Sequence, residues 1–209
     1  MKNATKHADT LHLLLKKLTK EYSPKPRQTM EPLQALVRAA MSYDVSDAKA
    51  DEAMRAIEKE FVDLNELRVA TDLEIHELLG VRYPAIERRV AMITQALNNI
   101  FEREHTMNLE RLKTVSRRDA RQFLRELPDI HPFVEAYVML YAFDGHTFPA
   151  DAEILAYLLE EEAVEEGSTI EDAQRFVEHN LKPEEMYDFF SAVRAAAFEE
   201  SRRKKKLKA

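Results

Sequence analysis

The stretch 124–154 holds residues that could take part in catalysis, and Asp151 is the main candidate. It follows the turn Phe148-Pro149-Ala150 and opens a helical pattern of apolar residues. A carboxylate held at a turn can stabilise positive charge or direct a water molecule. It can equally cap the helix, because an aspartate there accepts hydrogen bonds from free N–H groups of the first turn. The sequence leaves both roles open.

The composition argues against several other common kinds of functional site. The chain has no cysteine, which excludes disulfides, zinc–thiolate sites and a cysteine-ligated iron–sulfur cluster. Its seven histidines are scattered, and no two of them stand at metal-ligand spacing with an acid at the expected offset. We therefore expect neither a metal ion nor another cofactor.

Charge is distributed unevenly along the chain. The net charge is −7, but residues 31–200 sum to −18, while residues 1–30 carry +5 and residues 201–209 carry +6. Because nucleic-acid affinity rests largely on Lys and Arg, an acidic body repels phosphates, and a nucleic acid would contact the ends or a local patch. The tail could bind nucleic acid or only improve solubility. Its candidate contacts are Arg202, Arg203, Lys204, Lys205 and Lys206.

Composition and periodicity predict an all-α fold. Hydrophobic residues make up 45% and charged residues 33% of the chain, and its three glycines are too few for a turn-rich β protein. Apolar residues recur at helical spacing, which predicts about ten helices and no convincing strand. The longest apolar run, 136–143, is too short to span a membrane, and no signal-peptide pattern opens the chain. We therefore expect a cytoplasmic protein that does not contact a membrane.

Polar caps mark several helix boundaries. Asp9 or Thr10 is placed to cap the first helix. Residues 71–74 form a capping box before a helix that ends at Gly80. A second box, at 168–171, is predicted to open a later helix.

Four short motifs follow one another at a characteristic spacing. Residues 42–47 read Ser-Tyr-Asp-Val-Ser-Asp, and residues 127–132 read Leu-Pro-Asp-Ile-His-Pro between two helical patterns. Residues 142–145 read Ala-Phe-Asp-Gly, and Asp151 follows 23 residues after the first proline of the 127–132 turn. This order resembles the helix-hairpin-helix (HhH-GPD) superfamily of DNA glycosylases, and within it the endonuclease III-like group.

The resemblance implies a two-lobed helical fold. Residues 31–148 would form a helical barrel lobe that includes the hairpin, residues 1–30 plus 149–200 a second lobe, and residues 201–209 a disordered basic tail. DNA would lie in the cleft and the target base would be flipped out. Asp151 would be the carboxylate that stabilises the sugar cation as the N-glycosidic bond breaks.

Several positions depart from the family pattern. The lysine of bifunctional members falls at Phe133, so no AP-lyase step is expected. Glycines at the hairpin corners would present bare N–H groups to a phosphate, but Asp129 and His131 stand there. The glutamine that probes the DNA gap is replaced by Asp44. The candidate hairpin contacts are Pro128, Asp129, Ile130 and His131.

Two functions follow from this pattern. The first is a divergent DNA glycosylase-like protein of base-excision repair, at most monofunctional, with Asp151 as its carboxylate. The alternative is a catalytically inactive relative that serves as a weak DNA-binding or protein-interaction scaffold. DNA is thus the expected partner, with affinity reduced by the acidic substitutions, and a protein partner is the other. Four aromatic residues could wall a base pocket or belong to the core: Tyr43, Phe133, Tyr137 and Tyr141.

Overall fold

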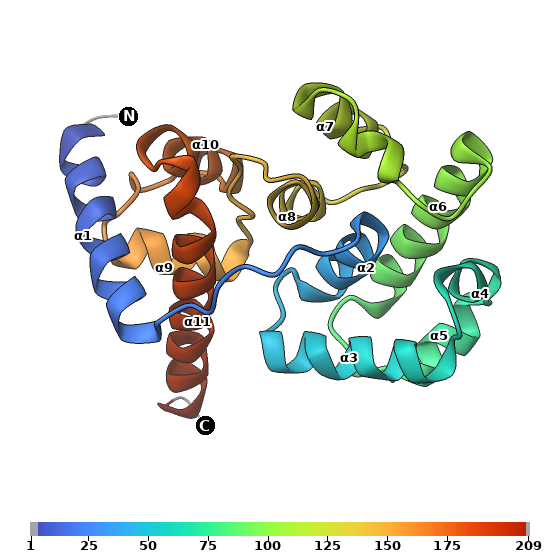
Figure 1. Ribbon diagram of the computed structural model, residues 1–209. Coiled ribbons are helices and arrows are strands. Elements are labelled where there is room, and N and C mark those ends of the chain that lie inside the picture. The colour runs from blue at the N-terminus through green and yellow to red at the C-terminus, as the bar shows by residue number, and fades with distance from the viewer. Residues whose placement is uncertain (1–3, 208–209) are drawn as a thin grey trace. The chain divides into compact units, whose positions relative to one another are not determined.

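The computed structural model describes residues 4–207, and within them the chain is built from α-helices and one short 3-10 helix, without a strand (Figure 1). The predicted all-α fold is therefore confirmed. By their contacts, these residues divide into two compact units. Unit 1 combines residues 4–28 with 145–207, and unit 2 comprises residues 29–144.

Unit 2 is assembled around α8, a helix that is buried on nearly all sides. Nine of the eleven residues of α8 are buried, and it packs on α2, which also buries nine of eleven. Helix α6 packs against α2, α4 and α5, while α7 packs on α8. The elements of unit 2 are α2 (Pro32–Ser42), α3 (Asp47–Glu60), α4 (Leu64–Val69), α5 (Asp72–Leu79), α6 (Ile86–Glu104), η1 (Glu110–Lys113), α7 (Arg117–Arg125) and α8 (Pro132–Ala142).

Unit 1 is organised around its last helix. Helix α11 packs against both α1 and α9, and the blue α1 and red α11 run side by side in Figure 1. Helix α10 packs against α9. The elements of unit 1 are α1 (Ala4–Tyr22), α9 (Ala152–Glu160), α10 (Ile170–Asn180) and α11 (Pro183–Leu207). This arrangement closes α11 over the segment that carries Asp151.

The local capping signals were predictive, with two errors of position. The capping box formed by Thr71 and Glu74 is confirmed, and Gly80 ends that helix at φ +79°. The box of α10 is instead made by Thr169 and Asp172, one residue later than expected. The first helix already begins at Ala4, so the predicted cap at residues 9 or 10 lies inside it and is wrong.

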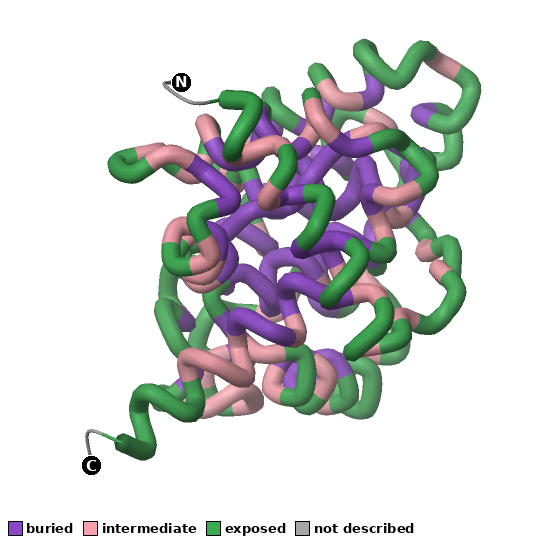
Figure 2. Tube along the Cα trace, turned by 90° about the vertical axis from the view of Figure 1, so that its left-hand side faces the viewer, coloured by how far each residue is buried: buried purple, intermediate pink, exposed green. Residues whose placement is uncertain are grey.

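The basic tail is helical rather than disordered as far as Leu207. Helix α11 continues through these residues, and Lys204 and Lys205 form ion pairs with Glu160 and Glu153 of α9. Basic side chains also suit the last turn of a helix because they offset its negative end. The expectation of a disordered tail is therefore wrong for residues 201–207, and residues 208–209 lie outside the described part. Figure 2 shows that this end of α11 is exposed.

No helix in the described part of the chain is long and apolar enough to cross a membrane.

Candidate functional site

Asp151 sits at the start of α9 with both carboxylate oxygens engaged. Its Oδ1 accepts a hydrogen bond from the backbone N–H of Ile154 at 2.9 Å, which caps the helix. Its Oδ2 forms an ion pair with Nη1 of Arg194 on α11 at 3.2 Å. The exposed fractions of the two side chains are 0% and 2%. The carboxylate is therefore a buried, paired and capping group.

The turn that precedes Asp151 is held by polar contacts to α10. Glu178 accepts hydrogen bonds from the hydroxyl of Thr147 at 2.8 Å and from the backbone N–H of Phe148 at 2.9 Å. Gln174 donates a third to the same oxygen, also at 2.8 Å. Because buried polar groups that find partners hold one geometry, this network fixes the direction in which Asp151 enters α9.

The hairpin of unit 2 keeps a tight turn without glycine. Asp129 adopts φ +49°, the left-handed region in which glycine is favoured, and its side chain is exposed. Aspartate tolerates this region better than most residues do. After it, Nδ1 of His131 accepts a hydrogen bond from the N–H of Phe133 at 3.2 Å and so caps α8. The N–H of Phe133 is therefore not available to a phosphate.

A stack of side chains joins the hairpin to the turn between α2 and α3. The rings of Tyr43 and His131 are parallel within 3°, with centroids 4.4 Å apart. The guanidinium of buried Arg89 lies 3.7 Å from the centre of the Tyr43 ring. Arg89 also donates to the carbonyls of Ala40 and Tyr43, which closes the C-terminal end of α2. The stack places exposed Asp44, the residue after Tyr43, close to the hairpin.

The predicted aromatic residues lie in one row. Tyr43 is followed by Phe133, Tyr137 and then Tyr141, with successive ring centroids 4.2 to 6.5 Å apart. Phe133, which the sequence resemblance sets against the lysine of bifunctional glycosylases, is fully buried. Tyr137 accepts a hydrogen bond from Arg38 at 3.1 Å, and burial raises its pKa. Phe133 is thus a core residue, with no nucleophile at that position.

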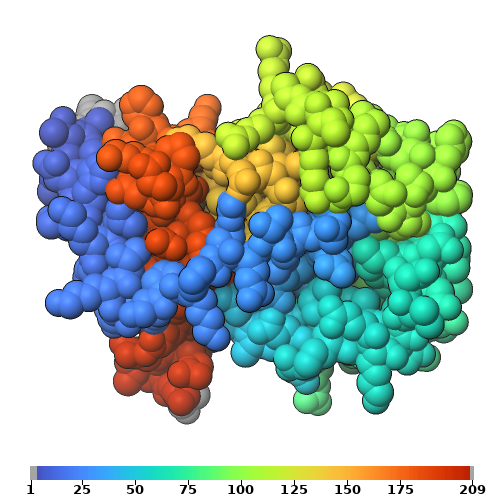
Figure 3. Space-filling view, in the orientation of Figure 1, coloured from blue at the N-terminus to red at the C-terminus, as the bar shows by residue number. Residues whose placement is uncertain are grey.

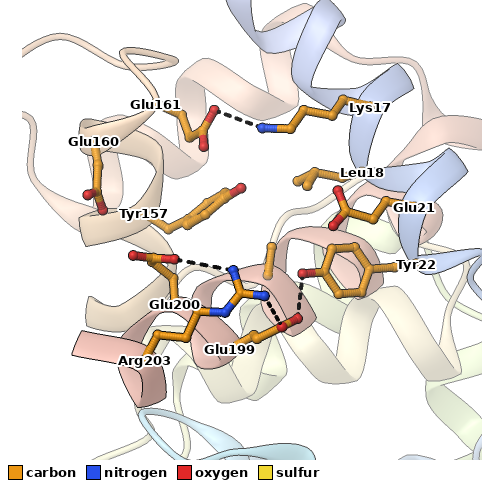
Figure 4. A pocket seen from close by; sticks show the side chains of 11 residues that line it. Lys17, Leu18, Glu21, Tyr22, Tyr157, Glu160, Glu161, Glu199, Glu200 and Arg203 are labelled. Carbon is orange, nitrogen blue, oxygen red and sulfur yellow. Dashed lines mark hydrogen bonds and ion pairs between the residues drawn. The ribbon is translucent and has the colours of Figure 1, made fainter. Parts of the chain in front are cut away.

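A separate hollow in unit 1 is lined mainly by glutamates and tyrosines (Figure 4). It measures about 310 Å³ and lies between α1, α9 and α11. The Tyr22 hydroxyl donates to Glu199 at 2.9 Å, and burial together with that carboxylate raises the pKa of Tyr22 to about 12. Arg203, one of the predicted tail contacts, lines this hollow and pairs with Glu199 and Glu200. Its charge is therefore already matched within unit 1.

The sequence-predicted positions divide between the two units. Asp151 and the basic tail belong to unit 1, whereas the hairpin, Asp44 and Phe133 belong to unit 2. No cluster of three or more potential metal-ligating side chains occurs among residues 4–207. The partner of Asp151, Arg194, was missed because it lies 43 residues further along the chain.

Comparison with known proteins shows which solved structures share this arrangement of helices. No family model and no curated protein matches the chain, but solved structures do. The 8-oxoguanine glycosylase/lyase of Clostridium acetobutylicum, bound to DNA with cytosine opposite 8-oxoguanine, aligns at a TM-score of 0.72 and 16% identity over 95% of this chain and 71% of the other. The chain has the endonuclease III-like glycosylase fold.

Two further structures with this glycosylase fold support the assignment. A trapped endonuclease III–DNA covalent intermediate aligns at a TM-score of 0.68 and 12% identity, over 89% of this chain and 84% of that one. The 3-methyladenine DNA glycosylase MagIII of H. pylori, bound to 1,N6-ethenoadenine, aligns at 0.66 and 13% identity over 92% and 98%. The resemblance noted in the sequence is therefore confirmed at the level of the fold.

Proposed function

We propose that this chain is a DNA-binding protein with the glycosylase fold that does not break N-glycosidic bonds. The observation that carries the proposal is the closed pair between Asp151 and Arg194. A carboxylate that stabilises a sugar cation must direct an oxygen and its negative charge toward the sugar. Here Oδ1 faces the first turn of α9, Oδ2 faces a buried guanidinium, and neither side chain is exposed beyond 2%.

The electrostatics of the pair support the same conclusion. A guanidinium at 3.2 Å offsets the negative charge of the carboxylate, and Coulomb interactions are strong where water is excluded. To serve in catalysis, Asp151 would have to leave Arg194 buried without this partner, which typically costs about 3–5 kcal/mol. That cost would add to the barrier of the reaction that the carboxylate is meant to lower.

DNA binding is supported by the fold and by the hairpin. Solved neighbours of this fold include endonuclease III and 8-oxoguanine glycosylase/lyase bound to DNA. The turn at Asp129 keeps the left-handed backbone of a tight hairpin. The replacements Asp129 and Asp44 are acidic and exposed, so the affinity should be modest.

A second candidate function is monofunctional base excision, with Asp151 as the carboxylate. The observation that favours it is that an aspartate stands at the start of α9, where the family resemblance places the catalytic residue. Phe133 in place of the lysine would then limit the reaction to cleavage of the N-glycosidic bond, without a lyase step.

An excision assay separates the two candidates. The protein and its Asp151→Asn variant are incubated with duplexes that carry damaged, deaminated or mismatched bases, and alkali then reveals abasic sites. We expect no product from either, while an active glycosylase cleaves its substrate under the same conditions. Product from the wild type that the folded Asp151→Asn variant does not form would establish the second function and overturn the first.

A binding assay tests the DNA-binding half of the proposal. Fluorescence anisotropy with an undamaged duplex should show an affinity that falls linearly on a log–log plot as salt rises. Comparison with a variant that lacks residues 201–209 shows how much the tail contributes to the affinity for DNA. Lys204 and Lys205 of this tail are already paired with acids of α9. Absence of binding even at low salt would overturn the proposal.

A further inference from the structure

Helix α7 carries four arginines on one side. At 3.6 residues per turn, successive residues are about 100° apart around the axis, so the four fall within an arc of about 100°. The buried residues of the helix occupy another side, where they face the core of unit 2. The arginine face consists of Arg117, Arg118, Arg121 and Arg125, and the buried side of Ala120, Phe123 and Leu124.

A single carboxylate anchors one half of the arginine face. Glu135 of α8 accepts from Nε of Arg121 at 2.5 Å and from Nε of Arg125 at 3.1 Å. Glu135 is 5% exposed, whereas the two arginines are 28% and 54% exposed. Two cations therefore share one buried anion and keep part of their surface in water, which leaves the cluster positive.

The other half of the arginine face, Arg117 and Arg118, forms no ion pair within the part of the chain that the structure describes. Both residues are exposed, and no hydrogen bond of their side chains is recorded within residues 4–207. The yellow-green segment that includes α7 is open to solvent in Figure 3. The surrounding residues 103–125 contain seven basic and three acidic side chains, a net charge of +4 within residues 31–200, which together sum to −18.

The dimensions of the face suit a row of phosphates better than a single anion. From Arg117 to Arg125 the axis of α7 rises roughly 12 Å, at 1.5 Å per residue. One DNA strand carries a charge about every 3.4 Å along the helix axis, so this length spans about three phosphates. Arginine can hold a phosphate through two parallel N–H donors. A row of arginines fits this repeated charge.

We propose that the arginine face of α7 docks on the phosphate backbone of duplex DNA. The inference rests on the proposed DNA-binding function and names the surface that carries it. It also accounts for how an acidic chain with an altered hairpin binds DNA. Arg117 and Arg118 supply free charge, and Glu135 holds Arg121 and Arg125 in line with them. The tail contributes less, because Arg203, Lys204 and Lys205 are matched by acids in unit 1.

The test compares two double variants that lose the same charge. Arg117→Gln with Arg118→Gln removes half of the arginine face, whereas Arg55→Gln with Lys59→Gln removes two exposed bases from α3 of the same unit. Each contact with a phosphate adds about 0.9 to the slope of log affinity against log salt. We expect the slope for undamaged duplex to fall by about two in the α7 variant and to stay unchanged in the α3 variant.

The outcomes distinguish this inference from the function on which it rests. Binding with the same slope in the wild type and in the α7 variant overturns the arginine face but leaves DNA binding intact. An equal loss in both variants shows that total charge matters rather than this surface, and also overturns it. If the wild type does not bind duplex at low salt, both proposals fail. Circular dichroism confirms that each variant is folded.

Discussion

The two units each contain a buried carboxylate paired with arginine, and the two pairs differ in what else can reach them. Asp151 and Arg194 are 0% and 2% exposed, and Asp151 also caps α9. Glu135 is buried as well, but its partners Arg121 and Arg125 are 28% and 54% exposed. The first pair is closed on both sides, whereas the second is open on the side of the arginines.

This difference teaches how the same chemical pair can serve separate purposes. The enclosed carboxylate of Asp151 caps α9 and pairs with Arg194, and neither side chain of the pair is exposed beyond 2%. The carboxylate of Glu135 instead holds two arginines whose side chains stay partly exposed to solvent. The resemblance noted in the sequence directs attention to Asp151, but of these two pairs only the one that includes arginines of α7 keeps side-chain surface in contact with solvent.

The largest effect should come from breaking the closed pair. Asp151→Ala leaves Arg194 buried without its counterion and removes the cap of α9, so the free energy of unfolding should fall by about 3–5 kcal/mol. Urea denaturation measures this loss of unfolding free energy. Asp63→Ala is the matched control, because Asp63 caps α4 through backbone N–H groups alone and should cost about 1 kcal/mol.

A double variant sharpens this prediction. Adding Arg194→Met to Asp151→Ala removes the stranded charge and should restore part of the lost stability, since replacing both members of a buried pair with apolar groups is often neutral. If Asp151→Ala costs no more than Asp63→Ala, the closed pair does not hold unit 1 together. Its role in the proposed function would then fail too.

Breaking the open pair should cost less. Glu135→Gln keeps the size of the side chain and removes the anion, but Arg121 and Arg125 can be hydrated because both are partly exposed. We expect a loss of about 1–3 kcal/mol in the same denaturation experiment. A loss as large as that of Asp151→Ala would show that the two pairs are equally closed, against the comparison drawn from their exposure.

The smallest effect concerns an acid–tyrosine contact in unit 1. Burial and then the Glu199 carboxylate raise the pKa of Tyr22 from 10.0 to about 12. Between these values the folded chain keeps the proton that the unfolded chain loses, so stability should fall as pH rises from 10 to about 12. Tyr22→Phe should flatten this decline in pH-dependent denaturation. Parallel curves for both proteins would contradict the shift.

The residues that cap the ends of helices were largely predictable from the sequence. The capping box at Thr71 and Glu74 and the glycine that ends α5 each depend on residues within a few positions, and both are present. The box of α10 was predicted one residue too early because Ser168-to-Glu171 and Thr169-to-Asp172 carry similar signatures, and the second of them forms. Local sequence patterns thus predict that a helix is present more accurately than they predict the residue at which it begins.

Contacts between distant segments were not predictable in the same way. The helical form of residues 201–207 depends partly on Glu153 and Glu160, which stand more than 40 residues earlier. A run of basic residues is typical of a solvated tail unless acids on another helix face it. Likewise, Tyr43 and His131 stack across 88 positions of the chain, so only folding brings the two predicted DNA-facing turns together.

The amino-acid sequence was sufficient for the all-α class, the order of the glycosylase motifs and the absence of a lysine at Phe133, because each depends on residue types and spacing. It was also sufficient to place Asp151 at the start of a helix. Whether that carboxylate is free or enclosed depends on Arg194, 43 residues further along. Burial is a property of packed helices, and only the packing of α11 against α9 brings Arg194 to Asp151 and encloses the carboxylate.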